Sequence, residues 1–434
     1  MAALVEEILA EAAKQGADAA EVSANLDSGL TVGVRKGELE TLEFNQDRGF
    51  GITLYLGTRK GSASTTDASA IADTVAAARR IATYTEEDPC AGVAEAELMP
   101  ASLPDLDLFH PWDVSPEEAT AMALACEAAG LAVDERLTNS DGAQVSSQQS
   151  VRVYGNSHGF VGAYSGTRQA LSCVLIGDDE QGMQRDYWYT IARDAADLDS
   201  AEAVGRQAAE RTVARLSPRK APTGNYPVLF APNMASGLIG HLLGALSGGA
   251  QYRKASFLLD AVGEAVLPQW LSLVEHPHRT KALGSASFDG DGVATREQAF
   301  ISNGVAEQYV LSTYSARKLG LQTSGNAGGV HNLELVGPQQ PVNDLLQEMG
   351  EGLLVTELMG QGVNGVTGDY SRGAAGFWVE NGKIKYPVAE VTVAGNLRDV
   401  YKNIVALGDD VDTRNNILAP SMLIREMMLA GDSE

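Results

Sequence analysis

The segment PVLFAPNMASGLIGHLLGALSGG, residues 227–249, joins a short apolar run to a helix of unusual composition. The apolar run 228–231 predicts a buried strand, and Pro232 ends it. Asn233 is expected to cap the helix that follows, because an asparagine side chain can accept a hydrogen bond from a free backbone N–H of the first turn. Apolar residues at helical spacing then predict one buried face: Met234, Leu238, Leu242, Ile239, Leu243 and Leu246.

Glycines form a second stripe along the same helix. Gly240, Gly244 and Gly248 recur every four residues. A glycine in a helix interior costs about 1 kcal/mol relative to alanine. We therefore expect something to pack very close to the backbone along this stripe. His241 stands beside the stripe as a candidate contact.

Composition and charge restrict the class of protein. A chain of 434 residues exceeds one ordinary core, so we expect two or three domains. The net charge of −25 disfavours a nucleic-acid partner, because phosphate is repelled by such a surface. No long apolar run and no signal-peptide pattern are present, so we expect no membrane partner. The sparse, odd set of Cys90, Cys126 and Cys173 indicates a cytoplasmic protein without disulfides, with Cys126 in the core.

The order of predicted elements indicates an α+β protein. We expect two helix–β-meander–helix modules, followed by a β-rich C-terminal domain that contains the glycine-striped helix. The expected boundaries are an N-terminal module at 1–88, a proline-rich linker at 89–114, a middle module at 115–217, a linker at 218–226 and the C-terminal domain at 227–434. About four strands are expected in the first module, with a turn at 45–49 among others, and five in the second. Hairpin turns are predicted at 302–304 and 380–383.

Two short glycine motifs are better explained as loops than as catalytic sites. GNSHG at 155–159 matches G-x-S-x-G, but it lies between two predicted strands and not at a strand-to-helix turn. GQGVNG at 360–365 matches the dinucleotide pattern, but no helix is predicted directly after it. We interpret it as a loop where backbone approaches another chain or a peptide, with Asp369, Tyr370 and Arg372 as candidate contacts. A solvated turn is an equal alternative.

The candidate metal ligands do not form a complete set. Glu275, His276 and His278 could bind a metal together, but Pro277 places them in a loop and no second cluster completes the site. The neighbours of His241 at i−4, i+3 and i+4 are Gly237, Gly244 and Ala245, so no second ligand shares its face, which favours a packed or interface histidine. The residues alone therefore yield no complete catalytic site.

Long runs of the chain resemble the TldD/PmbA family, and within it the PmbA (TldE) branch. The matching runs are RKGSAST at 59–65, YTEEDPCAGVA at 84–94, PDLDLFHP at 104–111, RLSPRKAP at 215–222, QYRKASFLLD at 251–260, YSARKLGL at 314–321, VTELMGQGVNGVTGDYSRGAAGFWVENGKIKYPV at 355–388 and AGNLRD at 394–399. In the TldD branch the helix described first carries H-E-x-x-x-H, and a cysteine near the C-terminus completes a zinc site. Here the matching positions hold Gly240, His241 and Ala245, and the last cysteine is Cys173. The resemblance therefore implies a degenerate site, with no metal ligand and no catalytic residue in this chain.

The resemblance also implies a subunit of a heterodimeric zinc metalloprotease. Such a complex hydrolyses unfolded or small peptides in a cavity between its subunits, with the zinc in a TldD-type partner and no cofactor in this chain. The expected cavity or partner contacts are His241, Gly244, Asp369, Tyr370 and Arg372. Three alternatives remain open: a homodimer, a non-enzymatic peptide-binding or modulator protein, and a self-sufficient hydrolase that uses His241 with Glu275, His276 and His278.

Overall fold

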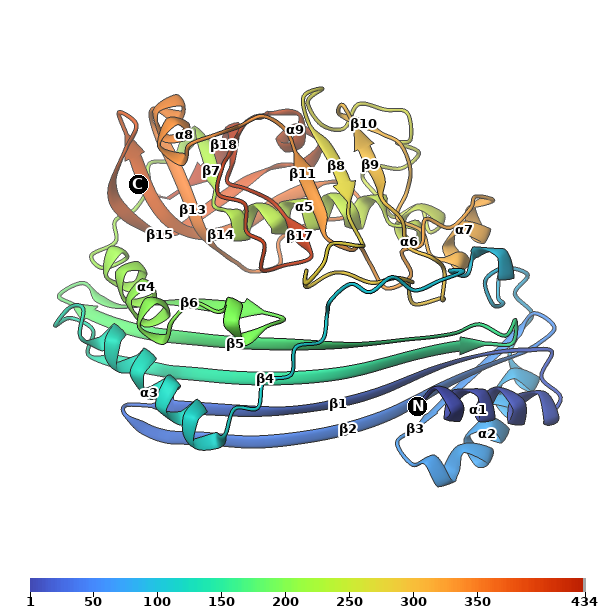
Figure 1. The fold of residues 1–434 in the computed structure, drawn as a ribbon. Helices are drawn as coiled ribbons and strands as arrows, with labels where there is room; N and C mark the ends of the chain where they lie inside the picture. Colours follow the sequence, from blue (N-terminus) through green and yellow to red (C-terminus); the bar gives the residue numbers. More distant parts are fainter. Residues whose placement is uncertain (432–434) are drawn as a thin grey trace.

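The structure is a computed structural model that describes residues 1–431. These residues form three β-sheets and nine α-helices, which confirms the predicted α+β class. A long, bowed sheet built from the first half of the chain lies beneath a more compact C-terminal region (Figure 1). None of the helices within residues 1–431 has the length and apolar character needed to cross a membrane.

The long sheet contains six antiparallel strands in the order β3-β2-β1-β4-β5-β6. The strands are β1 (Ala19–Arg35), β2 (Glu38–Leu56), β3 (Arg59–Thr65), β4 (Asn139–Asn156), β5 (Val161–Asp179) and β6 (Gly182–Ala192). β2 and β5 have 19 residues each, so each extends for about 60 Å.

The two predicted modules are the two halves of this single sheet. The order helix, strands, helix occurs twice, with α1 (Ala2–Lys14) and α2 (Ile71–Tyr84) in the first half and α3 (Pro116–Leu131) and α4 (Ala201–Ala214) in the second. β1 and β4 join the halves through a register that runs from Glu21↔Asn156 to Val34↔Ala143. The sequence did not predict this pairing, because it connects segments that are far apart along the chain.

Each half has three strands, so the expected four and five were wrong. β2 continues through 45–49, where a turn was expected, because Asn45 and Gly49 stay paired with Gly29 and Asn25 of β1. In β4 residues 140–142, which include Asp141 and Gly142, form a β-bulge, where the register against β5 shifts. Polar and glycine residues that resemble turn signals thus remain in long strands because they pair with residues of the adjacent strands.

The helices cover one face of the long sheet in two groups. α1 and α2 enclose a core that includes Val22, Phe50 and Ile52. α3 and α4 enclose a second core that contains Cys126 and Cys173, both buried, which confirms the core prediction for Cys126. Residues on the opposite face line pockets against segments of the C-terminal region.

The C-terminal region contains two sheets. The larger has the order β12-β16-β18-β15-β14-β13-β7, and an additional pairing of β18 with β7 closes five of its strands into a ring. Its strands are β7 (Gly224–Phe230), β12 (Gln339–Gln340), β13 (Gly352–Met359), β14 (Asp369–Glu380), β15 (Lys383–Asn396), β16 (Ile404–Gly408) and β18 (Met422–Ala430). The smaller sheet, in the order β10-β9-β8-β11-β17, contains β8 (Ser272–Glu275), β9 (Gln298–Ser302), β10 (Val305–Ala306), β11 (Leu333–Val336) and β17 (Ile417–Leu418).

One core joins both C-terminal sheets to α5 (Pro232–Leu246). Leu238, Ile239 and Leu242 of α5 are buried among residues of both sheets, as the apolar spacing predicted. Four shorter helices complete the region: α6 (Gly248–Tyr252), α7 (Thr313–Leu319), α8 (Val342–Met349) and α9 (Leu397–Lys402). α5 is therefore the element around which the C-terminal core forms.

The start of α5 differs from the prediction. Pro232 occupies its first turn, Ala231 is the N-cap, and no side chain caps the helix. Asn233 was therefore the wrong cap, because proline fits the first helical position and allows the helix to start earlier. The predicted hairpin turns at 302–304 and 380–383 are confirmed, with positive φ angles at Asn303 and Asn381.

Candidate functional site

α5 and β14 bring His241, Tyr370 and Arg372 together, and we call these three residues the α5–β14 cluster. The rings of His241 and Tyr370 meet edge to face, with centroids 6.2 Å apart. Tyr370 and Arg372 are two residues apart on one strand and therefore point to the same side of it. The charge of Arg372 acts on both other members. All three residues had been selected from the sequence as candidate contacts.

The cluster carries a positive charge and has unused donors. Burial, followed by the charge of Arg372, lowers the pKa of His241, so its imidazole is neutral at pH 7. Burial raises the pKa of Tyr370 to about 12, although the adjacent Arg372 opposes this shift. The Tyr370 side chain is almost completely buried, and Arg372 interacts with its hydroxyl without forming a hydrogen bond of normal geometry. Within residues 1–431 no other hydrogen-bond partner is found for this hydroxyl or for Nε of Arg372.

Asp369 lies outside the cluster. Its side chain alternates to the other side of β14 and is exposed. Its carboxylate accepts hydrogen bonds from Thr367 Oγ1 at 2.7 Å and from Asn396 Nδ2 at 3.2 Å. Asp369 therefore closes the loop between β13 and β14 and leaves the charge of Arg372 unopposed.

The loop that contains GQGVNG is a compact connection between two antiparallel strands. The N–H of Asn364 donates to the carbonyl of Asp369, and the N–H of Ser371 donates to that of Gly362. The chain enters β14 directly after the loop, without a helix. The interpretation of 360–365 as a loop is confirmed, and the geometry lacks the helix N-terminus that a dinucleotide phosphate would need.

The glycine face of α5 is open over most of its length. A Cβ atom at Gly237 or Gly244 would meet no atom within 4 Å, and one at Gly240 would meet only Ile417 Cδ1 at 3.9 Å. A Cβ atom at Gly248 would lie 2.4 Å from Ser315 Oγ. Within the described chain, close packing thus occurs at Gly248 and not along the rest of the stripe.

Gly240 and Ala245, where the resemblance leads us to expect a degenerate site, contribute no ligand to the surface beside His241. Ala245 is buried in the core, and Gly240 lacks a side chain. Across residues 1–431, no group of three or more His, Cys, Asp and Glu side chains is placed to hold a metal. The residues at this position therefore do not fit the zinc that the helix motif of the TldD branch would hold.

Glu275, His276 and His278 make contacts with separate partners. Glu275 is buried and accepts hydrogen bonds from the backbone N–H of His331 and the side chain of Asn326. His276 Nδ1 lies 3.1 Å from Glu297 Oε1, whereas His278 Nε2 lies 3.0 Å from Thr295 Oγ1. This arrangement gives no support to a shared metal site with His241. The contact between Glu275 and His331 was missed in the sequence because they are 56 positions apart.

GNSHG forms the hairpin turn between β4 and β5. The N–H of Asn156 donates to the carbonyl of Phe160, and Ser157 Oγ accepts from the N–H of Ala20 at 3.2 Å. The serine therefore holds the turn against β1. This confirms the hairpin interpretation of 155–159, since a nucleophile elbow would require a following helix.

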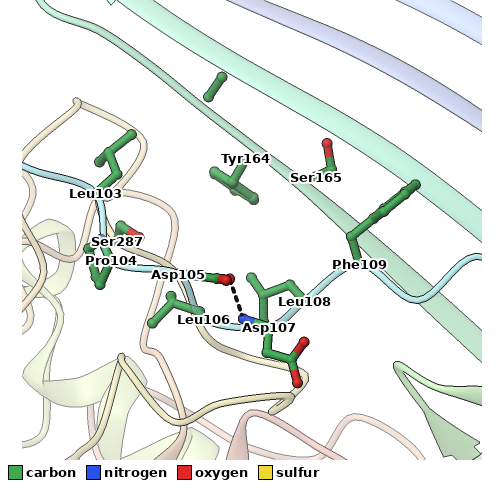
Figure 2. Close-up of a pocket in the computed structure, with 11 residues that line it drawn as sticks. Leu103, Pro104, Asp105, Leu106, Asp107, Leu108, Phe109, Tyr164, Ser165 and Ser287 are labelled. Carbon is green, nitrogen blue, oxygen red and sulfur yellow. Dashed lines mark hydrogen bonds between the residues drawn. The ribbon is translucent and has the colours of Figure 1, made fainter.

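Three adjoining pockets lie where the uncovered face of the long sheet meets other segments, and we call them the sheet–loop groove. Their volumes are about 430, 490 and 400 Å³. Figure 2 shows the first, with Asp105 and Leu106 of the linker on one side and Tyr164 of β5 on the other. Tyr164 also lines the second pocket, and Tyr154 lines the second and third. The groove therefore continues along the sheet.

Acidic side chains with altered pKa values stand in the groove. Burial raises the pKa of Glu21, whose carboxylate accepts hydrogen bonds from the hydroxyls of Tyr55 and Tyr154. Burial and the charge of Asp291 raise the pKa of Asp289 to about 6. The sequence analysis missed this groove. The run Asp289-Gly290-Asp291-Gly292 was its only local signal, and the sheet face that completes it comes from distant segments.

Comparison with known families matches three models that together span most of the chain. The PmbA/TldA metallopeptidase C-terminal domain matches residues 223–431. The central domain of the same family matches residues 109–216, and its domain 1 matches residues 20–82. The α5–β14 cluster lies in the first of these matches.

Curated relatives agree with the family models. The chain is 52% identical to "Metalloprotease PmbA" of Escherichia coli O157:H7, over 97% of this chain and 94% of the relative. It is 48% identical to a metalloprotease PmbA homolog of Haemophilus influenzae, over 97% and 94% of the two chains.

Solved structures share the fold over almost the whole chain. A putative modulator of DNA gyrase from Bacteroides thetaiotaomicron has a TM-score of 0.92 at 28% identity, covering 99% of this chain and 98% of the other. TldE from Thermococcus kodakarensis has a TM-score of 0.86 at 19% identity, covering 99% and 100%, which is evidence for the fold alone.

Proposed function

The chain belongs to the TldD/PmbA family of metallopeptidases, and from this premise we propose that it is the metal-free subunit of a complex that hydrolyses unfolded or small peptides. The observation that carries the proposal is the surface of α5. The position of a zinc-binding motif holds Gly240, His241 and Ala245, and no alternative group of metal ligands occurs within residues 1–431. The zinc and the hydrolytic step would belong to a TldD-type partner, and no step of the reaction is assigned to this chain.

The role of this chain in such a complex is to bind and position. The open glycine face of α5 allows another backbone to approach the helix more closely than a surface covered by side chains would. The α5–β14 cluster borders this face through His241 and supplies polar contacts. An extended peptide or a partner segment fits such a surface, whereas a folded domain cannot approach as closely. We place this activity in the cytoplasm, without a membrane or nucleic-acid partner.

Peptide binding without hydrolysis is the second candidate function. The sheet–loop groove favours it, because three adjoining pockets with aromatic and acidic walls lie within the single chain. A homodimer that uses the same α5 surface would be compatible with either function. The self-sufficient hydrolase receives no support, since His276 and His278 contact separate partners.

Cleavage of an unstructured fluorogenic peptide tests the proposal. The assay compares this chain alone, a TldD-type partner alone and the two chains co-expressed. We expect the co-expressed pair to cleave the peptide and this chain alone to be inactive. The matched control is a pair in which the motif glutamate of the partner is replaced by glutamine, which should abolish cleavage. Cleavage by this chain alone would contradict the proposal, and binding without cleavage in the pair would favour the second candidate.

A further inference from the structure

We propose that Arg372, Tyr370 and His241 form a binding site for the carboxylate group of an extended peptide that lies along the glycine face of α5. The inference rests on the proposed function only in taking the ligand to be a peptide. The site itself is argued from unused charge and unused donors in the α5–β14 cluster.

Arg372 is an unpaired cation in a strongly acidic protein. The chain has 57 acidic and 32 basic residues, so carboxylates outnumber the cations that could pair with them. Arg372 forms neither an ion pair nor a hydrogen bond of normal geometry with the described residues, and its Nε is buried. A buried donor without a partner is costly, and it therefore indicates a partner outside the chain. A guanidinium group recognises a carboxylate through two parallel hydrogen bonds.

Tyr370 supplies a second donor at the same place. Its side chain is only 2% exposed, and its hydroxyl has no partner of normal geometry within residues 1–431. Its backbone is held by pairing of β14 with β15, where Tyr370 lies opposite Gly395, and its ring packs against the imidazole of His241. Because its pKa is about 12, the hydroxyl keeps its proton at neutral pH and can donate to an anion.

His241 connects these donors to the open side of α5. The helical repeat places His241 on the same side of the helix as Gly237 and Gly244. The open space above both glycines, which flank His241 along the helix, allows an extended chain to run along α5 and to place a carboxylate at the cluster. The unpartnered Tyr370 hydroxyl is an observation independent of the glycine stripe, and it points to a ligand.

The donors of Arg372 and Tyr370 favour an anion as the ligand, and the open glycine face of α5 favours the carboxylate of a peptide. The acidic neighbour Asp369 is engaged by Thr367 and Asn396 on the other side of β14, so it does not neutralise the site. The carboxylate could be the C-terminus of the peptide or an Asp or Glu side chain. Inorganic phosphate shares the charge but could not use the glycine face.

Binding of labelled decapeptides to the full-length chain tests this site. The probe is an unstructured peptide with a fluorophore at its N-terminus, prepared with a free C-terminal carboxylate, as the C-terminal amide, and as the amide with one internal glutamate. Fluorescence anisotropy at low salt gives the three affinities, and inorganic phosphate serves as a competitor. We expect at least one carboxylate form to bind about tenfold more tightly than the plain amide, because charge-assisted hydrogen bonds to both donors are lost in the amide. The two carboxylate forms show which source the site accepts.

Single substitutions show which residues cause the preference for a carboxylate. Arg372→Gln should remove it, and Tyr370→Phe, which keeps the ring and its packing, should reduce it severalfold. Arg398→Gln is the matched control, since it makes the same charge change on an exposed residue of α9 and should leave the preference intact. Circular dichroism confirms that each variant is folded.

Several outcomes would overturn the site. These are equal binding of all three peptides, no binding of any peptide, full retention of the preference in Arg372→Gln, and competition by phosphate equal to that by the peptide carboxylate. Cleavage by the co-expressed pair is measured separately. If the pair cleaves the peptide and the carboxylate preference is absent, the proposed binding site is wrong while the proposed function stands. If the preference is present and the pair does not cleave, the binding site stands while the proposed function is wrong.

Discussion

The rings of His241 and Tyr370 lie edge to face with their centroids 6.2 Å apart, although 129 residues separate them in the sequence. This contact holds the open face of α5, at a point between Gly237 and Gly244, against the first residues of β14. It also brings the charge of Arg372 into range of the imidazole. The surface beside the glycine face of α5 is therefore a positively charged cluster.

Replacement of Arg372 should raise the pKa of His241. The positive guanidinium disfavours a protonated imidazole, so Arg372→Gln removes one of the two causes of the low pKa and leaves burial as the other. Histidine NMR signals followed between pH 5 and 8 measure the change, with His241→Gln used for assignment. Arg398→Gln should have no effect. An unchanged or lower His241 pKa in Arg372→Gln would contradict the placement of the charge.

Gly244→Ala should stabilise the chain and weaken its association with a partner. The new Cβ meets no atom of this chain, and alanine gains up to about 1 kcal/mol over glycine in a helix. Urea unfolding gives the stability, and co-purification with a TldD-type chain gives the association. If Gly244→Ala leaves association unchanged, the open face is not a contact surface.

Gly248→Ala is the matched contrast to that substitution. Its Cβ would lie 2.4 Å from Ser315 Oγ and 2.7 Å from Leu311 Cδ2, so we expect a loss of about 1–3 kcal/mol in the free energy of unfolding. The same urea experiment measures it. Stabilisation by this substitution would contradict the close packing of α6 against α7.

These two glycines show how far the sequence could predict the site. The four-residue spacing predicted one stripe, but the helix breaks at Ser247 and places Gly248 in α6, where it packs closely. The contacts His241, Tyr370 and Arg372 were chosen from the sequence, and the structure brings them together. Their unpaired state could not be predicted, because it depends on where every acidic residue of the fold lies.

The long sheet shows the corresponding limit for the fold. The helix–strands–helix order and the Asn381-Gly382 hairpin follow from local patterns and were predicted. The uninterrupted course of β2 through 45–49 was not predicted, because pairing with β1 overrides the local turn signal of Asn45 and Gly49. The groove around Asp289 was missed for the same reason, since its other wall comes from β1 and β4.

Arg215 connects the long sheet to the C-terminal region. It pairs with the buried Asp186 of β6 and with Glu357 of β13. Arg215→Leu would leave Asp186 with Arg211 as its remaining charged partner, so we expect a loss of about 3 kcal/mol in the free energy of unfolding. Glu357→Gln, at a more exposed position, should cost less than about 1 kcal/mol. Urea unfolding compares the two, and equal losses would contradict this ranking.

Asp289 should make stability depend on pH. Its folded pKa of about 6 lies above the usual value of an aspartate, so ionisation disfavours the folded state. The stability that the protonated form provides is present below about pH 4 and lost as the pH rises to about 6, by up to about 3 kcal/mol. Urea unfolding from pH 4 to 8 should show this loss in the wild type and not in Asp289→Asn. Asp291→Asn should move it to lower pH, and identical profiles for all three proteins would contradict the assignment.

Zinc content measures the central claim most directly. The full-length chain and its co-expressed complex with a TldD-type partner are purified without chelator, and zinc is quantified per chain by mass spectrometry. We predict no stoichiometric zinc in this chain alone and one zinc per pair in the complex, unchanged by His241→Gln. One zinc per molecule of this chain alone, lost in His241→Gln, would contradict the account and identify α5 as a metal-binding helix.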